Sequence, residues 1–182
     1  MKSALIVVDV QQSFEQRPYW RADGVDAFVA HVQQLIDEAQ ARGIPVLQVF
    51  HVEPTGVFSL ASGYVKTLTS LRIEPTEVFY KEVHSALFGR NASGKTLETW
   101  LRDHGIEHVI VTGIRTEQCC ETTTRHASDS GFQVTYALDA THTFPMVAKS
   151  GRAYTVSDIM ERTALVLDAR FAKVVNTADV FA

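Results

Sequence analysis

The sequence predicts an α/β protein of three layers, in which a doubly wound, mostly parallel sheet of six strands lies between two layers of helices. Short apolar runs rich in β-branched residues alternate along the chain with longer segments whose apolar residues recur at helical spacing. Such alternation is typical of parallel sheets covered on both faces. The length of 182 residues, with 46% hydrophobic and 21% charged residues, is that of one globular domain. We therefore expect a single domain over residues 1–182.

The first half of the chain contains three of the predicted strands. Residues 5–8 form a continuous aliphatic run with no polar face, which predicts a strand buried on both sides. Apolar residues then recur at helical spacing over 25–39, and Gly43 follows as an end signal for this helix. Two further strands are predicted over 46–50 and 78–80.

The second half continues the alternation. Its predicted elements are helices over 97–101, 116–131 and 156–167 and strands over 108–111, 132–138 and 171–175. The least periodic segments of the chain are 53–70 and 141–153. We expect these two segments to form loops or short helices over one edge of the sheet.

Composition and charge exclude several classes of protein. The chain has 17 Lys and Arg residues against 21 Asp and Glu residues, a formal net charge of -4, and no basic stretch, so nucleic acid is not an expected partner. The longest apolar run, residues 4–8, is far shorter than the ~20 residues that span a bilayer. We expect no signal peptide and no membrane partner. The two cysteines, Cys119 and Cys120, are adjacent and cannot build a disulfide framework, which favours a reducing cytoplasm.

Polar side chains follow the predicted strands at their carboxyl ends, where open α/β sheets bind ligands. Asp9 comes directly after the first aliphatic run, so its carboxylate must be hydrogen-bonded, paired or ready to take a proton. Lys81 occupies the equivalent end of the third strand. An ammonium there could pair with Asp9 and keep a neighbouring thiol ionised, or it could be a solvated strand-end charge.

Cys119 lies in the first turn of the helix predicted from Thr116, a good N-cap residue. The helix dipole and the free N–H groups of that turn favour a thiolate, and the same N–H groups can stabilise an oxyanion. The alternative is a packed structural cysteine, since free cysteines are often buried. For Cys120, which faces another side of the helix, we expect packing.

A second motif leads to a different function. The segment from Gly89 to Thr96 matches the phosphate-binding pattern G-x-x-x-x-G-K-[ST], with Lys95 as its lysine. A P-loop follows directly on a buried strand, and charged and polar residues precede this segment instead. We therefore expect a surface loop whose Ser93 or Gly94 starts the next helix. A nucleotide binder remains an alternative, as does a non-catalytic protein that binds a small molecule on the same fold.

Four motifs, taken in order, resemble one known family. They are Ile6-Val7-Val8-Asp9-Val10-Gln11 with Phe14, Lys81-x-x-x-Ser85-Ala86-Leu87-Phe88, Gly113-x-x-Thr116-x-x-Cys119, and Leu138-Asp139-Ala140-Thr141. Together they cover nearly the whole chain and are similar to those of the isochorismatase-like cysteine hydrolases. That superfamily includes nicotinamidases, N-carbamoylsarcosine amidase, ureidoacrylate amidases and isochorismatase.

The resemblance implies a catalytic triad of Asp9, Lys81 and Cys119. In the family mechanism the aspartate takes the thiol proton, the lysine supports the charged site, and the thiolate attacks an amide or related carbonyl to give an acyl-enzyme. The resemblance also implies a cis peptide bond between Ile114 and Arg115 and an oxyanion hole formed by the N–H groups of Arg115 and Cys119. Because true isochorismatases do not rely on a cysteine nucleophile, Cys119 favours amide-type C–N hydrolysis. A homo-oligomer is expected on the resemblance alone.

The chain departs from the nicotinamidase pattern at the metal site. Nicotinamidases bind a divalent metal through an Asp-x-His and a later His after the second strand, and only His51 of this set is present here. One imidazole and the nearby Glu53 fall short of the three protein ligands of a catalytic zinc site, so we predict no metal and no cofactor. The expected ligand is a small-molecule substrate. The candidates for substrate contact are Gln11, Phe14, Trp20, His51 and Phe58.

Overall fold

The fold is built on one six-stranded parallel sheet in the strand order β3-β2-β1-β4-β5-β8. It is described by a computed structural model of residues 1–182. The strands are β1 (Ser3–Val8), β2 (Val46–His51), β3 (Glu77–Lys81), β4 (His108–Ile114), β5 (Gln133–His142) and β8 (Lys173–Val175). The chain order reverses on either side of β1, as a doubly wound sheet requires, so the predicted fold class is confirmed.

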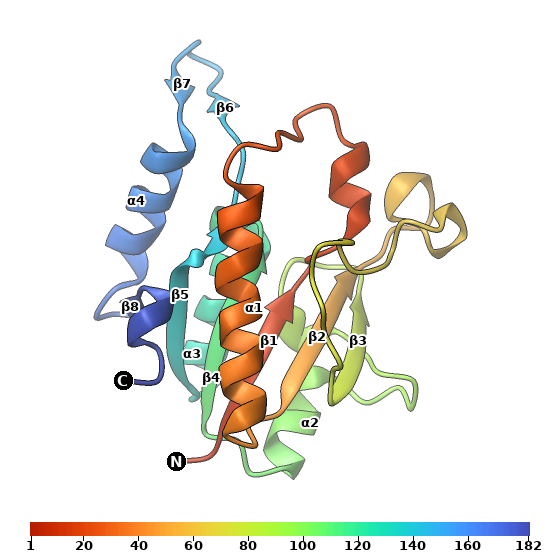
Figure 1. The fold of residues 1–182 in the computed structure, drawn as a ribbon, viewed down its shortest axis with the longest axis vertical. Coiled ribbons are helices and arrows are strands. Elements are labelled where there is room, and N and C mark those ends of the chain that lie inside the picture. The colour runs from red at the N-terminus through yellow and green to blue at the C-terminus, as the bar shows by residue number, and fades with distance from the viewer.

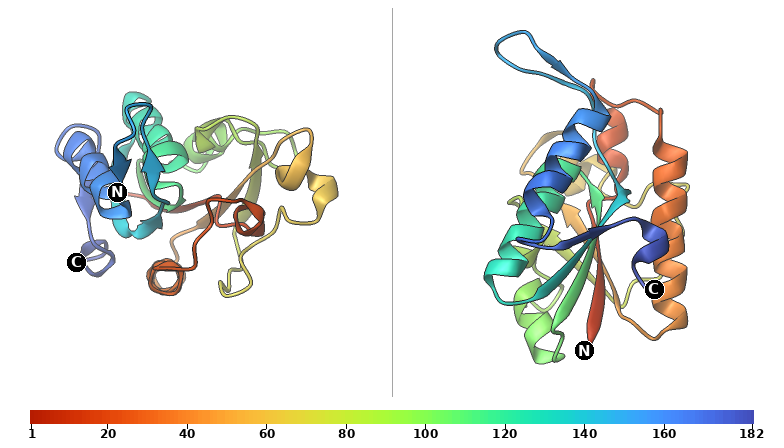
Figure 2. Two further views of the ribbon diagram at one scale, coloured as in Figure 1. Left: turned by 90° about the horizontal axis from the view of Figure 1, so that it is seen from above. Right: turned by 90° about the vertical axis from the view of Figure 1, so that its left-hand side faces the viewer.

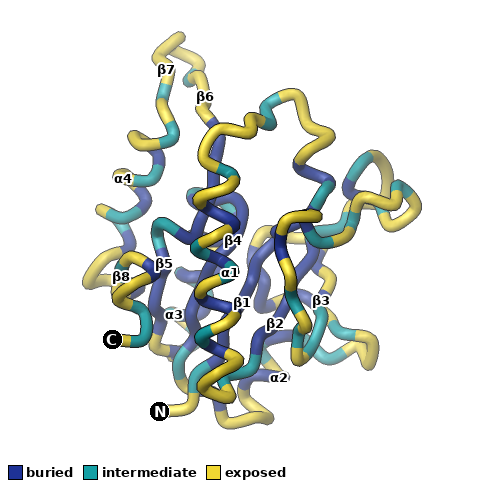
Figure 3. The backbone as a smooth tube through the Cα atoms, viewed as in Figure 1, coloured by how far each residue is buried: buried dark blue, intermediate teal, exposed yellow.

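Helices cover both faces of this sheet (Figures 1 and 2). The helix α1 (Val25–Ala41) lies on one face, and α2 (Leu97–Asp103), α3 (Glu121–Asp129) and α4 (Val156–Leu167) lie on the other. The alternation of side chains along β1 explains the two cores. Leu5 and Val7 pack with the buried side of α1, whereas Ile6 and Val8 pack with apolar residues of α2, α3 and α4. Figure 3 shows the resulting band of buried strands beneath helices whose outer sides are exposed.

The segments 116–131 and 141–153 differ from the sequence prediction. The helix predicted over 116–131 is divided into a wide π-type turn, Thr116–Cys120, and the α-helix Glu121–Asp129. Within the segment 141–153, predicted to be irregular, β5 continues to residue 142 and the short strands β6 (Met146–Val147) and β7 (Ala153–Tyr154) form a hairpin that projects from the body (Figure 1). Two-residue strands carry no periodic signal in a sequence. No helix is both long and apolar enough to cross a membrane.

The segment from Gly89 to Thr96 folds as a turn closed on itself. The N–H groups of Ser93 and Lys95 donate to Asn91 Oδ1, and Lys95 Nζ pairs with Asp103 at 2.5 Å. The predicted helix start at Ser93 or Gly94 is wrong, because Thr96 caps α2. These N–H groups and this ammonium already have partners within the protein, so the geometry gives the nucleotide alternative no support.

Gly113 allows β4 to run close beside β1. Its φ is 132°, and a Cβ placed there would lie 1.9 Å from the carbonyl oxygen of Val8. We expect Gly113→Ala to lower the free energy of unfolding by about 3 kcal/mol or more. The backbone strain of alanine at this φ and the clash of its Cβ with Val8 both destabilise the folded state. Gly131→Ala, at a φ of 87° with open space around it, should cost only about 1–2 kcal/mol. Urea denaturation of both variants measures the difference, and equal losses would contradict the predicted clash.

Candidate active site

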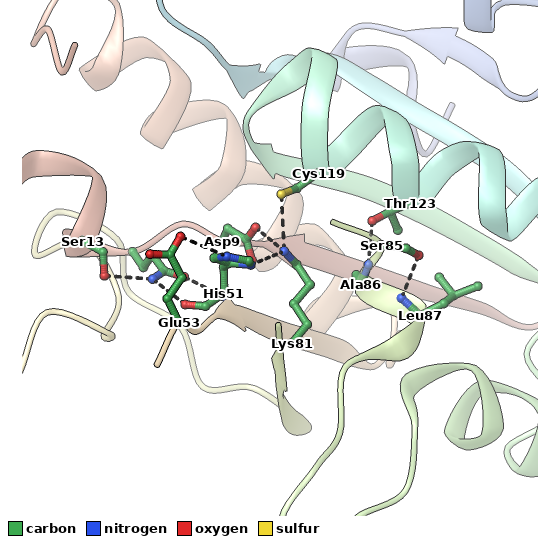
Figure 4. Close-up of polar contacts among 11 residues, drawn as sticks. Asp9, Ser13, His51, Glu53, Lys81, Ser85, Ala86, Leu87, Cys119 and Thr123 are labelled. Carbon is green, nitrogen blue, oxygen red and sulfur yellow. Dashed lines mark hydrogen bonds and ion pairs between the residues drawn. The ribbon is translucent and has the colours of Figure 1, made fainter. Parts of the chain in front are cut away.

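Three side chains from different parts of the sheet meet at its carboxyl edge (Figure 4). Asp9 follows β1 with a φ of 53°, Lys81 ends β3, and Cys119 lies in the turn between β4 and α3. Because β2 separates β3 from β1, the long lysine stem must pass over β2 to reach Asp9. Lys81 Nζ lies 2.7 Å from Asp9 Oδ2 and 3.3 Å from Cys119 Sγ. The geometry therefore brings together the three residues that the sequence singled out.

The Asp9–Lys81 pair is removed from solvent, since both side chains are 0% exposed. Burial opposes the charge on the Lys81 ammonium, but the Asp9 carboxylate and the Cys119 sulfur outweigh this effect and raise the pKa of Lys81. Lys81 is therefore an ammonium throughout the neutral range. The second carboxylate oxygen, Asp9 Oδ1, is buried and accepts no hydrogen bond. An unpartnered carboxylate oxygen beside a thiol is suited to accept a proton.

Cys119 is a protonated thiol in this arrangement. Burial, together with the adjacent Asp9 carboxylate, raises the pKa of Cys119 to about 12, although Lys81 acts in the opposite direction. The sequence interpretation expected the helix N-terminus to favour a thiolate. The structure contradicts that expectation, because the Cys119 side chain is only 8% exposed and Lys81 pairs with the Asp9 carboxylate as well as with the sulfur. Cys120 is fully buried in the core, as expected for a packing residue.

Arg115 has its side chain fixed beside the turn that carries Cys119. The peptide bond between Ile114 and Arg115 is cis, and the Arg115 N–H donates no hydrogen bond within the protein. The guanidinium lies 3.1 Å from a carboxylate oxygen of Glu117 and packs over the rings of Tyr19 and Phe144. These contacts place the guanidinium between the Glu117 carboxylate and an aromatic cluster that includes Phe144.

The Gln11 side chain is hydrogen-bonded to the backbone of His51. The His51 N–H donates to Gln11 Oε1 at 2.8 Å, and Gln11 Nε2 donates to the His51 carbonyl at 3.1 Å. The imidazole lies 3.3 Å from Lys81 Nζ through Nδ1 and 3.6 Å from Glu53 through Nε2. Burial and the Lys81 ammonium lower the pKa of His51, so its imidazole is neutral at pH 7.

The aromatic candidates form a cluster with Phe144. The ring of Phe14 meets Phe58 edge-on at 5.1 Å, and Trp20 lies 5.4 Å from the ring of Phe144. Phe14 and Phe58 are each 6% exposed. Burial, helped by Arg115, lowers the pKa of the neighbouring His142 to about 4, so His142 contributes no charge to the cluster. Contact of Phe14, Trp20 or Phe58 with a substrate stays a prediction.

Two contacts that the sequence did not reveal tie the loop after Lys81 to the helix after Cys119. The Ala86 N–H donates to Thr123 Oγ1 at 2.9 Å, and Ser85 Oγ lies 2.7 Å from His126 Nδ1 (Figure 4 shows the first). Ser85 belongs to the second motif, but its partner His126 lies 41 positions further along the chain, on α3. Pairing across such a separation has no local sequence signal.

Nearly the whole chain matches one protein family. The family model described as the isochorismatase domain matches residues 3–179. The chain belongs to the isochorismatase family. An isochorismatase family protein of Bacillus subtilis, YrdC, is 27% identical over 97% of this chain and 92% of its own length. The nicotinamidase/pyrazinamidase of Mycobacterium tuberculosis is 26% identical over 76% of this chain and 85% of its own.

Solved structures of isochorismatase-family proteins agree with this assignment. One from Chromobacterium violaceum superposes with a TM-score of 0.84 at 27% identity, covering 98% of this chain and 91% of the other. The protein is thus a hydrolase of the isochorismatase family.

The protein has no group of three or more His, Cys, Asp or Glu side chains placed to hold a metal ion. Near His51, Glu53 offers one carboxylate oxygen, 3.6 Å from the imidazole Nε2.

Proposed function

We propose that this isochorismatase-family protein is a metal-independent cysteine hydrolase that cleaves the C–N bond of a small amide or carbamoyl compound through an acyl-enzyme on Cys119. The observation that carries the proposal is the position of the Lys81 ammonium, 2.7 Å from the Asp9 carboxylate and 3.3 Å from the Cys119 sulfur. This contact set links a proton acceptor, a cation and a nucleophile in one buried group.

The first half-reaction begins with transfer of the thiol proton from Cys119 to Asp9. The sulfur then forms a bond to the substrate carbonyl carbon, and the carbonyl electron pair moves onto its oxygen. When the tetrahedral species collapses, the C–N bond breaks and the leaving nitrogen takes the proton from Asp9. Ammonia or an amine departs, and a thioester on Cys119 remains.

In the second half-reaction water replaces the thiol. Asp9 accepts a proton from the water as its oxygen attacks the thioester carbon, and the C–S bond breaks. The departing sulfur takes the proton back from Asp9, which restores the resting thiol and carboxylate. The same carboxylate thus serves as acid and base in turn.

The charge balance of the buried group favours this sequence. Before proton transfer the negative charge is on Asp9, and afterwards it is on Cys119, while Lys81 contacts both. The net charge of the three residues does not change during the transfer. The negative charge moves from Asp9 to Cys119, and no additional charge has to be buried away from water. A protonated resting thiol with a high pKa is compatible with this order, because the proton leaves only when substrate is present.

Stabilisation of the oxyanion is assigned to the backbone after β4. The Arg115 N–H is free of any acceptor within the protein, and it precedes the nucleophile by four residues in the same turn. Two preorganised N–H donors, those of Arg115 and Cys119, would stabilise the developing negative charge on the substrate oxygen. The amide class is favoured by the nicotinamidase relative, and independence of metal by the lack of a third ligand near His51.

Release of ammonia from a panel of primary amides and N-carbamoyl compounds tests the proposal. We expect at least one compound to be turned over in the presence of EDTA, and rapid acid quench followed by mass spectrometry to find an acyl group on the peptide that contains Cys119. Binding without ammonia release across the panel would favour the non-catalytic alternative. Turnover without a mass increase, in a protein whose Cys119→Ala variant remains active, would exclude the acyl-enzyme.

A further inference from the structure

We infer that His51 is a positioning residue, whose imidazole is the third acceptor that holds the Lys81 ammonium between Asp9 and Cys119. This inference rests on the proposed function, in which Lys81 stabilises the sulfur. It assigns to His51 a role that differs from the substrate contact expected from the sequence.

The three acceptors around Lys81 match the three N–H donors of an ammonium group. They are Asp9 Oδ2 at 2.7 Å, Cys119 Sγ at 3.3 Å and His51 Nδ1 at 3.3 Å. Each acceptor comes from a different segment, at the ends of β1, β4 and β2. Because the Lys81 side chain is 0% exposed, water has little access to replace a lost partner. Removal of the imidazole would therefore release one of three anchors of the ammonium.

The backbone and the ring of His51 both have contacts that hold them in place. Gln11 binds both the N–H and the carbonyl of His51, and its amide is anchored to Ser13 at 2.9 Å. The edge of the ring meets Phe58 at 5.7 Å between centroids. Glu53, 3.6 Å from Nε2, favours the tautomer with the proton on Nε2, which leaves the lone pair of Nδ1 toward Lys81 (Figure 4).

The charged neighbours of His51 support a neutral acceptor. Lys81 lies on one side of the ring and Glu53 on the other. The carboxylates of Asp9 and Glu53 act to raise the pKa of His51, and His84 acts to lower it. Burial and Lys81 lower the pKa of His51, so the lone pair on Nδ1 is available in the neutral range. A residue in this position acts on the nucleophile through Lys81 and needs no contact with substrate.

The test compares His51→Leu, which removes the acceptor, with His51→Asn, whose Oδ1 is separated from the backbone by the same number of bonds as Nδ1. The probe is iodoacetamide, and the rate of Cys119 alkylation is followed from pH 7 to pH 10 by intact mass and peptide mapping. Because a less firmly held ammonium stabilises the thiolate less, we expect alkylation in His51→Leu to be about three- to tenfold slower at a given pH, with kcat for the best amide about 10- to 100-fold lower and KM within about twofold. His51→Asn should stay within about threefold of the parent in both measurements.

Controls separate this inference from the proposed function. His84→Leu, an equivalent change at an exposed histidine, should leave alkylation and turnover unchanged. A raised KM in His51→Leu, with alkylation and kcat unchanged, would overturn the inference in favour of substrate contact. If alkylation is unaffected even by Lys81→Met, the proposed role of Lys81 itself is wrong. Should His51→Leu lose its cooperative unfolding transition, His51→Ala repeats the same comparison.

Discussion

Replacing Cys119 with alanine is expected to lower kcat for the best amide by about 10⁴-fold or more, since loss of the proposed nucleophile would remove the covalent route altogether. The fold should survive, because the side chain is small and 8% exposed, and its removal leaves the Asp9–Lys81 pair intact. Cys119→Ser should be nearly as inactive, because a hydroxyl is far less acidic than a thiol. Initial rates of ammonia release, with the thermal midpoint measured on the same samples, give both quantities.

Cys120 provides the matched control for that experiment. It is the neighbouring residue, it carries the same thiol, and it is buried in the core rather than in contact with Lys81. Cys120→Ala should lose stability through a small cavity, of order 1 kcal/mol, and keep most of its turnover. An active Cys119→Ala variant, or an inactive but folded Cys120→Ala variant, would contradict the assignment of the nucleophile.

The fold could be predicted from local patterns because its central strands are buried on both sides. The aliphatic run before Asp9 and the helical spacing over 25–39 each correspond to one element, β1 and α1. The hairpin of β6 and β7 could not be predicted, since its strands have two residues each. The division of the helix after Thr116 was also missed, because a π-type turn differs from an α-helical turn by only one residue in its spacing.

The location of the candidate site could be predicted, because its residues lie at the ends of strands. Its chemistry could be predicted only in part. Asp9, Lys81 and Cys119 each follow or end a strand, and parallel strands bring their carboxyl ends to one edge. The protonation state of Cys119 depends on burial and on a carboxylate 110 positions away in the chain, which no local pattern records. The bonds that join Gln11 to His51 likewise span 40 positions. The contact of the His51 imidazole with Lys81, across 30 positions, has no local sequence signal either.

The second large effect is expected at the Asp9–Lys81 pair, where the two single variants should behave in opposite ways toward alkylation. Asp9→Asn removes a carboxylate that raises the pKa of Cys119 and leaves Lys81, which lowers it. The thiolate fraction at pH 7 should therefore rise, and alkylation by iodoacetamide should become faster. Turnover should nevertheless fall by about 10²–10⁴-fold, because the proposed proton acceptor is gone.

Lys81→Met should slow alkylation, since it removes the charge that favours the thiolate. It also leaves the Asp9 carboxylate unpaired at a position with 0% exposure, which should cost about 3–5 kcal/mol of unfolding free energy. The double variant Asp9→Asn/Lys81→Met should recover much of this loss, because neither charge then remains buried. Urea denaturation and alkylation rates on the four proteins complete a double-mutant cycle.

This cycle tests whether Asp9 acts as a base or only through the effect of its negative charge on Cys119. If Asp9 acted only by its field, the faster alkylation in Asp9→Asn would be accompanied by faster turnover, because a more ionised sulfur would attack more readily. If Asp9 carries the proton, the thiolate gains reactivity toward iodoacetamide, but the leaving nitrogen loses its proton donor. An increase in alkylation together with a loss of ammonia release is therefore the combination that assigns proton transfer to Asp9. A parallel change of both rates would refute that assignment and leave Lys81 and Cys119 as the only reacting pair.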